Sequence, residues 1–192
     1  MKKNVCTLFL MCFIYSCQME QLPINSLADR ITEGASKGRI LFRIIADERD
    51  SSKDYFEISS ERDKVLITGN SDLSLSTGLN WYLKYVANIH LSWNNLSQKL
   101  PEVLPLPLEK IRKETPMRNR YYLNYCAYSY SMAFWNWERW EKEIDWMALH
   151  GINMPLSITG MEVVWYNLLK RLGYTTKEIN EFISGPAFMA WW

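Results

Sequence analysis

The residues that could do chemistry follow two predicted strands in the second half of the chain. Asn124 and Cys126 close an aromatic, strand-like run, and Gly160 and Glu162 come after a second apolar run over residues 152–158. A helix-forming stretch separates the two runs, and strand, helix, strand is the order of a parallel βαβ unit. A right-handed crossover brings both strand ends to one edge, and in an eight-fold barrel that edge holds the active site. Asn124, Cys126, Gly160 and Glu162 are therefore predicted to lie at or just beyond the strand ends on this edge.

Helical segments must position these strands. Asn136 can cap a helix that Gly151 stops, and a second helix stops at Gly173. A third helix opens with a capping box over residues 175–178. Only two strand–helix units are visible, and two units cannot close a barrel. Residues 116–192 are therefore predicted to be a fragment of a larger α/β domain.

The helix after Asn136 is predicted to be amphipathic, with Trp137, Trp140 and Ile144 on one apolar stripe. Its charged residues form opposite-charge pairs four positions apart, Glu138 with Lys142 and Arg139 with Glu143. The acidic side chains of this helix are expected to be solvated or paired on its surface: Glu138, Glu143 and Asp145.

Tryptophan and tyrosine are abundant, with nine and eleven residues, and most of the tryptophans lie from Trp135 onward. Aromatic faces of this kind stack on the apolar faces of sugars, although tryptophans also simply fill large cores. The charge is nearly balanced, with 22 basic and 21 acidic residues. This balance argues against a nucleic-acid footprint or a broad contact with anionic membrane.

Residues 22–115 are predicted to form a small α/β module. Short apolar runs predict strands at 40–45, 55–58 and 64–68, the last two joined as a hairpin, and a closing strand at 89–93. Between them, Asn70-Ser71 can cap a helix whose apolar face carries Leu75, Leu79, Tyr82 and Val86. Prolines at 101, 105 and 107 indicate a linker or edge extension, and the domain boundary is placed near Pro116.

Residues 1–17 read as an export signal. Lys2 and Lys3 precede an apolar run that is too short to span a bilayer and that ends at Ser16-Cys17. The pattern is typical of a lipoprotein signal in which Cys17 is lipidated, and an ordinary secretory signal is the alternative. Either predicts an exported protein, and the lipoprotein signal predicts a location in the bacterial cell envelope with the lipid as its contact with membrane. Cys126 then stands alone, so no intramolecular disulfide framework is expected.

Longer stretches of the second half carry a family resemblance. Residues 120–126, 128–131, 137–153, 178–182 and 185–191 resemble the opening of the catalytic barrel in the alpha-N-acetylglucosaminidase family, glycoside hydrolase family 89. The resemblance implies that residues 116–192 are the incomplete start of a TIM (β/α)8 barrel. The first module also fits the small α/β domain that precedes the barrel in that family. The resemblance implies release of terminal alpha-linked N-acetylglucosamine from glycans, with retention of configuration. No metal or other cofactor is expected.

In that family two glutamates act as acid/base and nucleophile, and both are expected beyond Trp192, so the isolated chain is expected to be inactive. The resemblance implies that Asn124 hydrogen-bonds sugar hydroxyls, that Cys126 lines the same pocket and that Trp191 forms an aromatic wall. Gly160 and Glu162 are expected to support the pocket from behind, Glu162 alternatively as a carboxylate at a helix N-terminus.

Two other interpretations remain open from the sequence. One is a surface lipoprotein that binds glycans without cleaving them, and the other is a different barrel glycosidase that shares the N-terminal module. The long resemblance favours the family 89 interpretation over both. The sequence does not predict the oligomeric state or the natural glycan.

Overall fold

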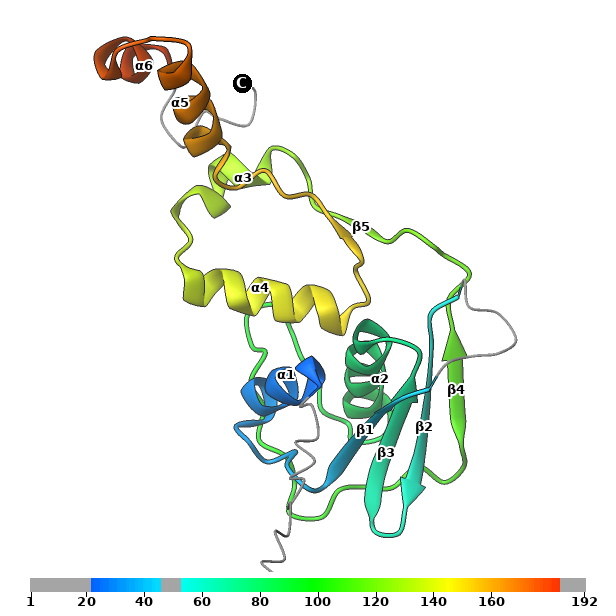
Figure 1. Cartoon of the computed structure of the whole chain (residues 1–192). Helices are drawn as coiled ribbons and strands as arrows, with labels where there is room; N and C mark the ends of the chain where they lie inside the picture. The colour runs from blue at the N-terminus through cyan, green and yellow to red at the C-terminus, as the bar shows by residue number, and fades with distance from the viewer. Residues whose placement is uncertain (1–21, 46–52, 184–192) are drawn as a thin grey trace, which may run out of the picture.

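The computed structural model describes residues 22–45 and 53–183, which form an α/β module followed by a second, more extended part (Figure 1). The predicted signal, Cys17 and Trp191 lie outside the described residues. The elements of the first module are α1 (Pro23–Thr32), β1 (Ile40–Ile44), β2 (Tyr55–Glu61), β3 (Lys64–Gly69), α2 (Asp72–Tyr85) and β4 (Ile111–Glu114). Those of the second part are β5 (Tyr121–Tyr122), α3 (Ala127–Tyr130), η1 (Met132–Phe134), α4 (Trp137–Leu149), β6 (Met154–Pro155), α5 (Met161–Arg171) and α6 (Thr176–Phe182). The predicted mixed α/β fold with opening βα units is confirmed.

The first module is a four-stranded sheet in the order β1-β3-β2-β4. β1 runs parallel to β3, whereas β2 pairs antiparallel with both β3 and β4. The predicted hairpin is present but tighter than expected, because pairing reaches Glu61 and Lys64 and leaves a two-residue turn. Arg62 in that turn has a left-handed φ of 59°, the backbone that a short hairpin turn requires.

The predicted closing strand at 89–93 is wrong, and its place at the sheet edge is taken by β4. In the predicted segment only Ser92 makes a β-bridge, to Asn95, while Leu91 is buried in the core from a loop. β4 follows the proline-rich stretch and pairs with β2 from Ile111 to Glu114. Proline cannot donate to a ladder, so a strand after it suits the edge of the sheet.

Helix α2 fills the core as its sequence predicts. Ser71 accepts the backbone N–H of Ser74 as the N-cap, and Leu75, Leu79 and Tyr82 are fully buried. Helix α1 was not predicted, although Pro23 at its start and Ile24, Leu27, Ala28 and Ile31 follow the helical spacing of an apolar stripe. Its buried face packs into the same core.

Gly78 lets α2 approach the sheet closely, since a Cβ there would lie 2.8 Å from Ile67 Cγ2. Helix propensity alone would make Gly78→Ala stabilising by about 1 kcal/mol. The clash with β3 and with Phe56 costs about 1–3 kcal/mol, so we expect a net loss of stability in denaturant titration. The exposed Lys84→Ala is the control and should stay within about 0.5 kcal/mol of the parent chain. A Gly78→Ala chain more stable than the parent would contradict this packing.

In the second part, β5 precedes α4 in the sequence and β6 follows it. The two strands pair in parallel, as a βαβ unit requires. Both strands are shorter than predicted, and α3 with η1 occupies the polar stretch after β5. Asn136 accepts the N–H of Arg139 at 3.0 Å and caps α4, and Gly151, with φ of 72°, ends it as predicted. The capping box of Thr175 and Glu178 also forms, at the start of α6.

The orientation of α4 differs from the prediction. Glu143 and Asp145, expected at the surface, are only 0% and 5% exposed, whereas Trp137 and Ile144 of the apolar stripe are 70% and 45% exposed. The reason is that both carboxylates find hydrogen-bond donors on other segments, which offset the cost of removing a charge from water. Helix α4 therefore packs on the first module through its acidic face.

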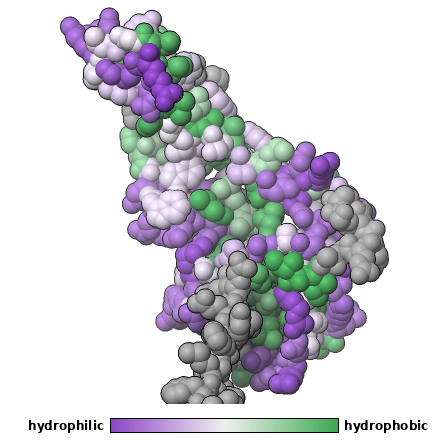
Figure 2. Space-filling model, in the orientation of Figure 1, coloured by the Kyte–Doolittle hydropathy of each residue, from purple (hydrophilic) through white to green (hydrophobic). Residues whose placement is uncertain are grey.

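Helices α5 and α6 extend away from the module, and no residue of α5 is buried (Figure 1). Green apolar groups reach the surface of this arm among purple polar ones (Figure 2). Its exposed apolar residues include Val163, Val164 and Leu172. Within residues 22–45 and 53–183, no helix has both the length and the apolar character to cross a membrane.

Candidate functional site

The predicted site lies at the edge where β5 and β6 end. Because Tyr121 pairs with Met154 and Tyr122 with Pro155 in parallel, the segments that follow both strands leave the sheet in the same direction. The N–H of Leu156 continues this pairing by donating to the carbonyl of Tyr122 at 2.7 Å. The two segments that carry the predicted site residues thus start from one edge.

Asn124 is exposed at this edge, and its side chain shapes the turn into α3. Its Oδ1 accepts the backbone N–H of Cys126 at 2.8 Å, and its carbonyl accepts the N–H of Ala127 at 3.2 Å. The side-chain oxygen is therefore engaged inside the turn. The amide NH2 group is the part of Asn124 that could donate to a ligand hydroxyl. Cys126, two residues on, is half-buried with a free thiol.

Gly160 and Glu162 lie at the start of α5. Gly160 is the N-cap, with a left-handed φ of 84° and open space around it, and Glu162 lies in the first turn, where a carboxylate favours the helix dipole. Glu162 lines a groove of about 400 Å³ between α5 and α6, together with Val163, Tyr166, Asn180 and Ile183. The structure thus brings Asn124 and Cys126 together in one turn and sets Glu162 against α6.

Two further hollows lie in the first module and at its junction with β5. A groove of about 620 Å³ is lined by Trp81, Tyr85 and the segment from Pro105 to Lys113. A cavity of about 270 Å³ is bordered by Asp54, Arg120 and His150. None of these three hollows is lined by Asn124 or Cys126. Across the described ranges no group of three His, Cys, Asp or Glu side chains is placed to hold a metal ion.

Behind the edge, the carboxylate of Glu143 joins three segments. Its Oε1 accepts the hydroxyl of Tyr122 at 2.8 Å, and its Oε2 accepts Trp93 Nε1 at 2.7 Å and the Arg139 guanidinium at 3.1 Å. Burial, and then the hydrogen bond to this carboxylate, raise the pKa of Tyr122 to about 12. The sequence spacing predicted the Arg139–Glu143 pair, but it gave no sign that the pair is buried.

Aromatic rings pack around this ion pair. The Arg139 guanidinium lies 3.9 Å from the ring centroid of Trp135 and 4.5 Å from that of Trp93. Trp140 contacts Trp135 edge-on at 5.0 Å and stacks on Tyr128 of α3 at 6.0 Å. This cluster packs the segment after β5 against α4.

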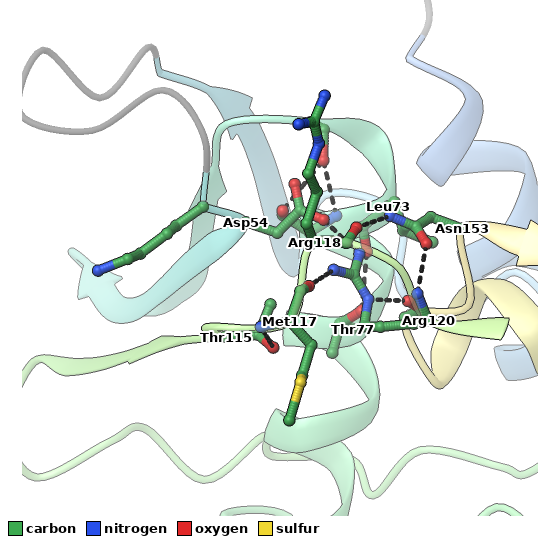
Figure 3. A network of polar contacts seen from close by, with 12 residues as sticks. Asp54, Leu73, Thr77, Thr115, Met117, Arg118, Arg120 and Asn153 are labelled. Carbon is green, nitrogen blue, oxygen red and sulfur yellow. Dashed lines mark hydrogen bonds and ion pairs between the residues drawn. The ribbon is translucent and has the colours of Figure 1, made fainter.

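Two other polar contacts bind the second part to the first module. Arg30 of α1 holds Asp145 of α4 with two bonds, from Nε at 2.7 Å and from Nη2 at 2.6 Å. Arg120 lies at the centre of a second network, shown in Figure 3, where it donates to Asp54 and to the carbonyls of Gly151 and Met117. Asn153 closes this network on the backbone of Arg118 and Arg120.

The hydroxyls of Tyr82 in the first module and of Tyr122 at the junction predict a loss of stability at alkaline pH. The pKa values of Tyr82 and Tyr122 both rise from 10.0 to about 12, in each case chiefly through burial. A group whose pKa is higher in the folded state contributes stability that is complete below pH 10 and is lost as the pH rises through 12. Tyr122→Phe should therefore flatten the fall of unfolding free energy between pH 10 and 12, by up to about 1.4 kcal/mol per pH unit. An unchanged slope in denaturant titrations over that range would contradict the raised pKa.

Comparisons with known proteins agree with this arrangement. Residues 23–106 match the model of the N-terminal domain of alpha-N-acetylglucosaminidase, and residues 120–192 match that of its TIM-barrel domain. Human alpha-N-acetylglucosaminidase is 44% identical over 128 residues, which are 67% of this chain and 17% of the human protein. The chain thus spans about a fifth or less of the length of this relative.

Solved structures give the same result. A family 89 glycoside hydrolase from Clostridium perfringens, in complex with 2-acetamido-1,2-dideoxynojirimycin, superposes with a TM-score of 0.78 at 41% identity. The match covers 88% of this chain and 19% of that one. A double glutamate-to-glutamine variant from the same organism, in complex with its substrate GlcNAc-alpha-1,4-galactose, gives 0.79 at 40% identity with the same coverage.

The α/β module, the parallel βα units behind it and the polar edge beyond them place the chain among proteins related to the barrel glycoside hydrolases. Within that class, the chain belongs to the alpha-N-acetylglucosaminidase family, glycoside hydrolase family 89. The predicted family is confirmed. The roles of Asn124, Cys126, Gly160, Glu162 and Trp191, and the domain boundaries, stay predictions.

Proposed function

We propose that this chain is part of a retaining exo-alpha-N-acetylglucosaminidase that hydrolyses terminal alpha-linked N-acetylglucosamine from glycans. The observation that carries the proposal is the match of both modules, in order, to a family whose solved member binds GlcNAc-alpha-1,4-galactose as its substrate. In this proposal Asn124 and Cys126 form one wall of the sugar pocket, with the amide of Asn124 donating to a sugar hydroxyl and Trp191 as an aromatic wall. Gly160 and Glu162 support that wall.

The chemistry of retention needs two carboxyl groups about 5–5.5 Å apart across the scissile bond, one as acid/base and one as nucleophile. Neither Glu143 nor Glu162 fits the pair, because Glu143 is fully buried in the junction and Glu162 lies against α6. We therefore place both catalytic glutamates outside residues 1–192 and expect no turnover by these residues alone.

The test is hydrolysis of paired substrates by the protein in its full encoded length. We expect release of N-acetylglucosamine from GlcNAc-alpha-1,4-galactose and none from the beta-linked isomer. Asn124→Ala should lower kcat/KM by about 10- to 100-fold, the range for loss of a hydrogen bond to a bound ligand, while Asn80→Ala in α2 should leave kcat/KM unchanged. Binding of the alpha-linked glycan without any release would instead make the protein a glycan-binding lipoprotein.

We also propose that the protein is exported to the bacterial cell envelope and anchored through a lipid on Cys17. The supporting feature is the short apolar run with its lysines ahead of Ser16-Cys17. Labelling of the expressing cells with a radioactive fatty acid should mark the parent protein and not the Cys17→Ser variant. Equal labelling of both would exclude Cys17 as the acceptor.

A further inference from the structure

The fully buried carboxylate of Glu143 does more than pair with its own helix. Each oxygen serves different partners: Oε2 holds Trp93 Nε1 and the guanidinium of Arg139, whereas Oε1 receives only the hydroxyl of Tyr122, at 2.8 Å. Arg139 is in turn confined between the rings of Trp93 and Trp135. The oxygen that faces β5 therefore belongs to a fully buried carboxylate whose other oxygen is held by Trp93 and Arg139.

Tyr122 links the Glu143 carboxylate to the turn that carries Asn124 and Cys126. It is the last residue of β5, and its carbonyl is fixed to β6 by the N–H of Leu156 at 2.7 Å. The side-chain hydroxyl therefore ties the strand end to α4 while the backbone ties it to β6. Asn124 follows two residues later, and its Oδ1 holds the N–H of Cys126 at 2.8 Å. A shift of Tyr122 would move this turn as a unit.

We propose that Glu143 and Tyr122 are positioning residues, which fix the end of β5 so that the Asn124 amide and the Cys126 thiol face the sugar. The proposal rests on the function proposed above. Its second support is the chemistry of the bond itself. The phenol of Tyr122 is protonated throughout the neutral range, as tyrosine ordinarily is, and so donates to the Glu143 carboxylate at 2.8 Å.

The test compares two variants that each remove one buried phenol hydroxyl. Tyr122→Phe removes the bond to Glu143, and Tyr82→Phe removes the bond to the carbonyl of Pro105, 3.0 Å away in the first module. Both should lower the melting temperature by a few degrees, as loss of one hydrogen bond does in a domain of this size. Only the first touches β5. The readouts are alkylation of Cys126 by iodoacetamide, followed by site-resolved mass spectrometry, and KM with GlcNAc-alpha-1,4-galactose, both on the full-length protein.

For Tyr122→Phe we expect the rate of Cys126 alkylation to rise by about fivefold. Loss of one ordinary hydrogen bond favours local opening by about this factor. KM should rise by a similar factor with a smaller change in kcat, because the sugar-binding wall is displaced rather than the reacting groups. Tyr82→Phe should leave the alkylation rate and KM unchanged. Equal changes in the two variants, or no change in either, would overturn the positioning role.

The Glu143→Gln variant tests the hydrogen bond to Tyr122 separately from the negative charge of the carboxylate. A glutamine there could accept from Trp93 and Arg139 through its oxygen and donate to the Tyr122 oxygen through its amide. We expect Cys126 alkylation within about twofold of the parent protein, well short of the change in Tyr122→Phe. A change as large as that in Tyr122→Phe would contradict transmission through the Tyr122 bond. If the parent protein hydrolyses nothing, the proposed function fails, and the alkylation rates alone still decide the positioning role.

Discussion

Replacing Glu143 with alanine is expected to lower the free energy of unfolding of this chain by about 3–5 kcal/mol. Glu143 has no exposed surface, and its carboxylate accepts hydrogen bonds from Trp93, Tyr122 and Arg139. The variant would leave the donors of Trp93 and Tyr122 and the positive charge of Arg139 without their shared acceptor. Denaturant titration followed by tryptophan fluorescence measures the loss.

Glu138→Ala is the matched control in the same helix. Glu138 forms the other pair of α4, with Lys142 at 2.9 Å, but its side chain is 73% exposed. Exposed pairs of this spacing contribute only about 0.3–0.5 kcal/mol. Similar losses in the two variants would show that the buried position of Glu143 is not what matters and would contradict the junction described here.

Leu149→Ala is expected to cost about 2–5 kcal/mol, the range for a fully buried leucine that leaves a cavity. Leu149 ends α4, yet it is fully buried in the core cluster of the first module, and its carbonyl accepts Asn80 Nδ2 at 3.0 Å. The same denaturant titration tests it. Leu172→Ala, at an exposed site after α5, should stay within about 0.5 kcal/mol of the parent chain. If Leu149→Ala were as mild, α4 would not share the core of the first module.

Local signals predicted the elements whose stabilising contacts are close in sequence. The stripe of Leu75, Leu79 and Tyr82 and the cap at Ser71 both specify α2, because spacing and capping are properties of one helix. The capping box at Thr175 and the stop at Gly151 were predicted for the same reason. The family could also be predicted, because the resemblance is a property of the residue order and does not depend on tertiary contacts.

Contacts between distant segments could not be predicted. The apolar run at 89–93 has strand-forming residues, but the partner edge of β2 is taken by residues 111–114. On α4, the helical period separated an apolar from a charged face and could not tell which one meets the module. Arg30 and Trp93, which lie at least 50 positions from their carboxylate partners, decide that Glu143 and Asp145 are buried. The engagement of the Asn124 oxygen in its own turn is likewise visible only in the backbone geometry.

The most direct test of the account is the anomeric form of the sugar that the full-length protein releases from GlcNAc-alpha-1,4-galactose, followed by proton NMR from the first minutes. A retaining enzyme with two glutamates places the new hydroxyl on the face of the departed galactose. We expect alpha-N-acetylglucosamine to appear first and then to mutarotate to the equilibrium mixture. Early appearance of the beta anomer, or no release of N-acetylglucosamine at all, would contradict it.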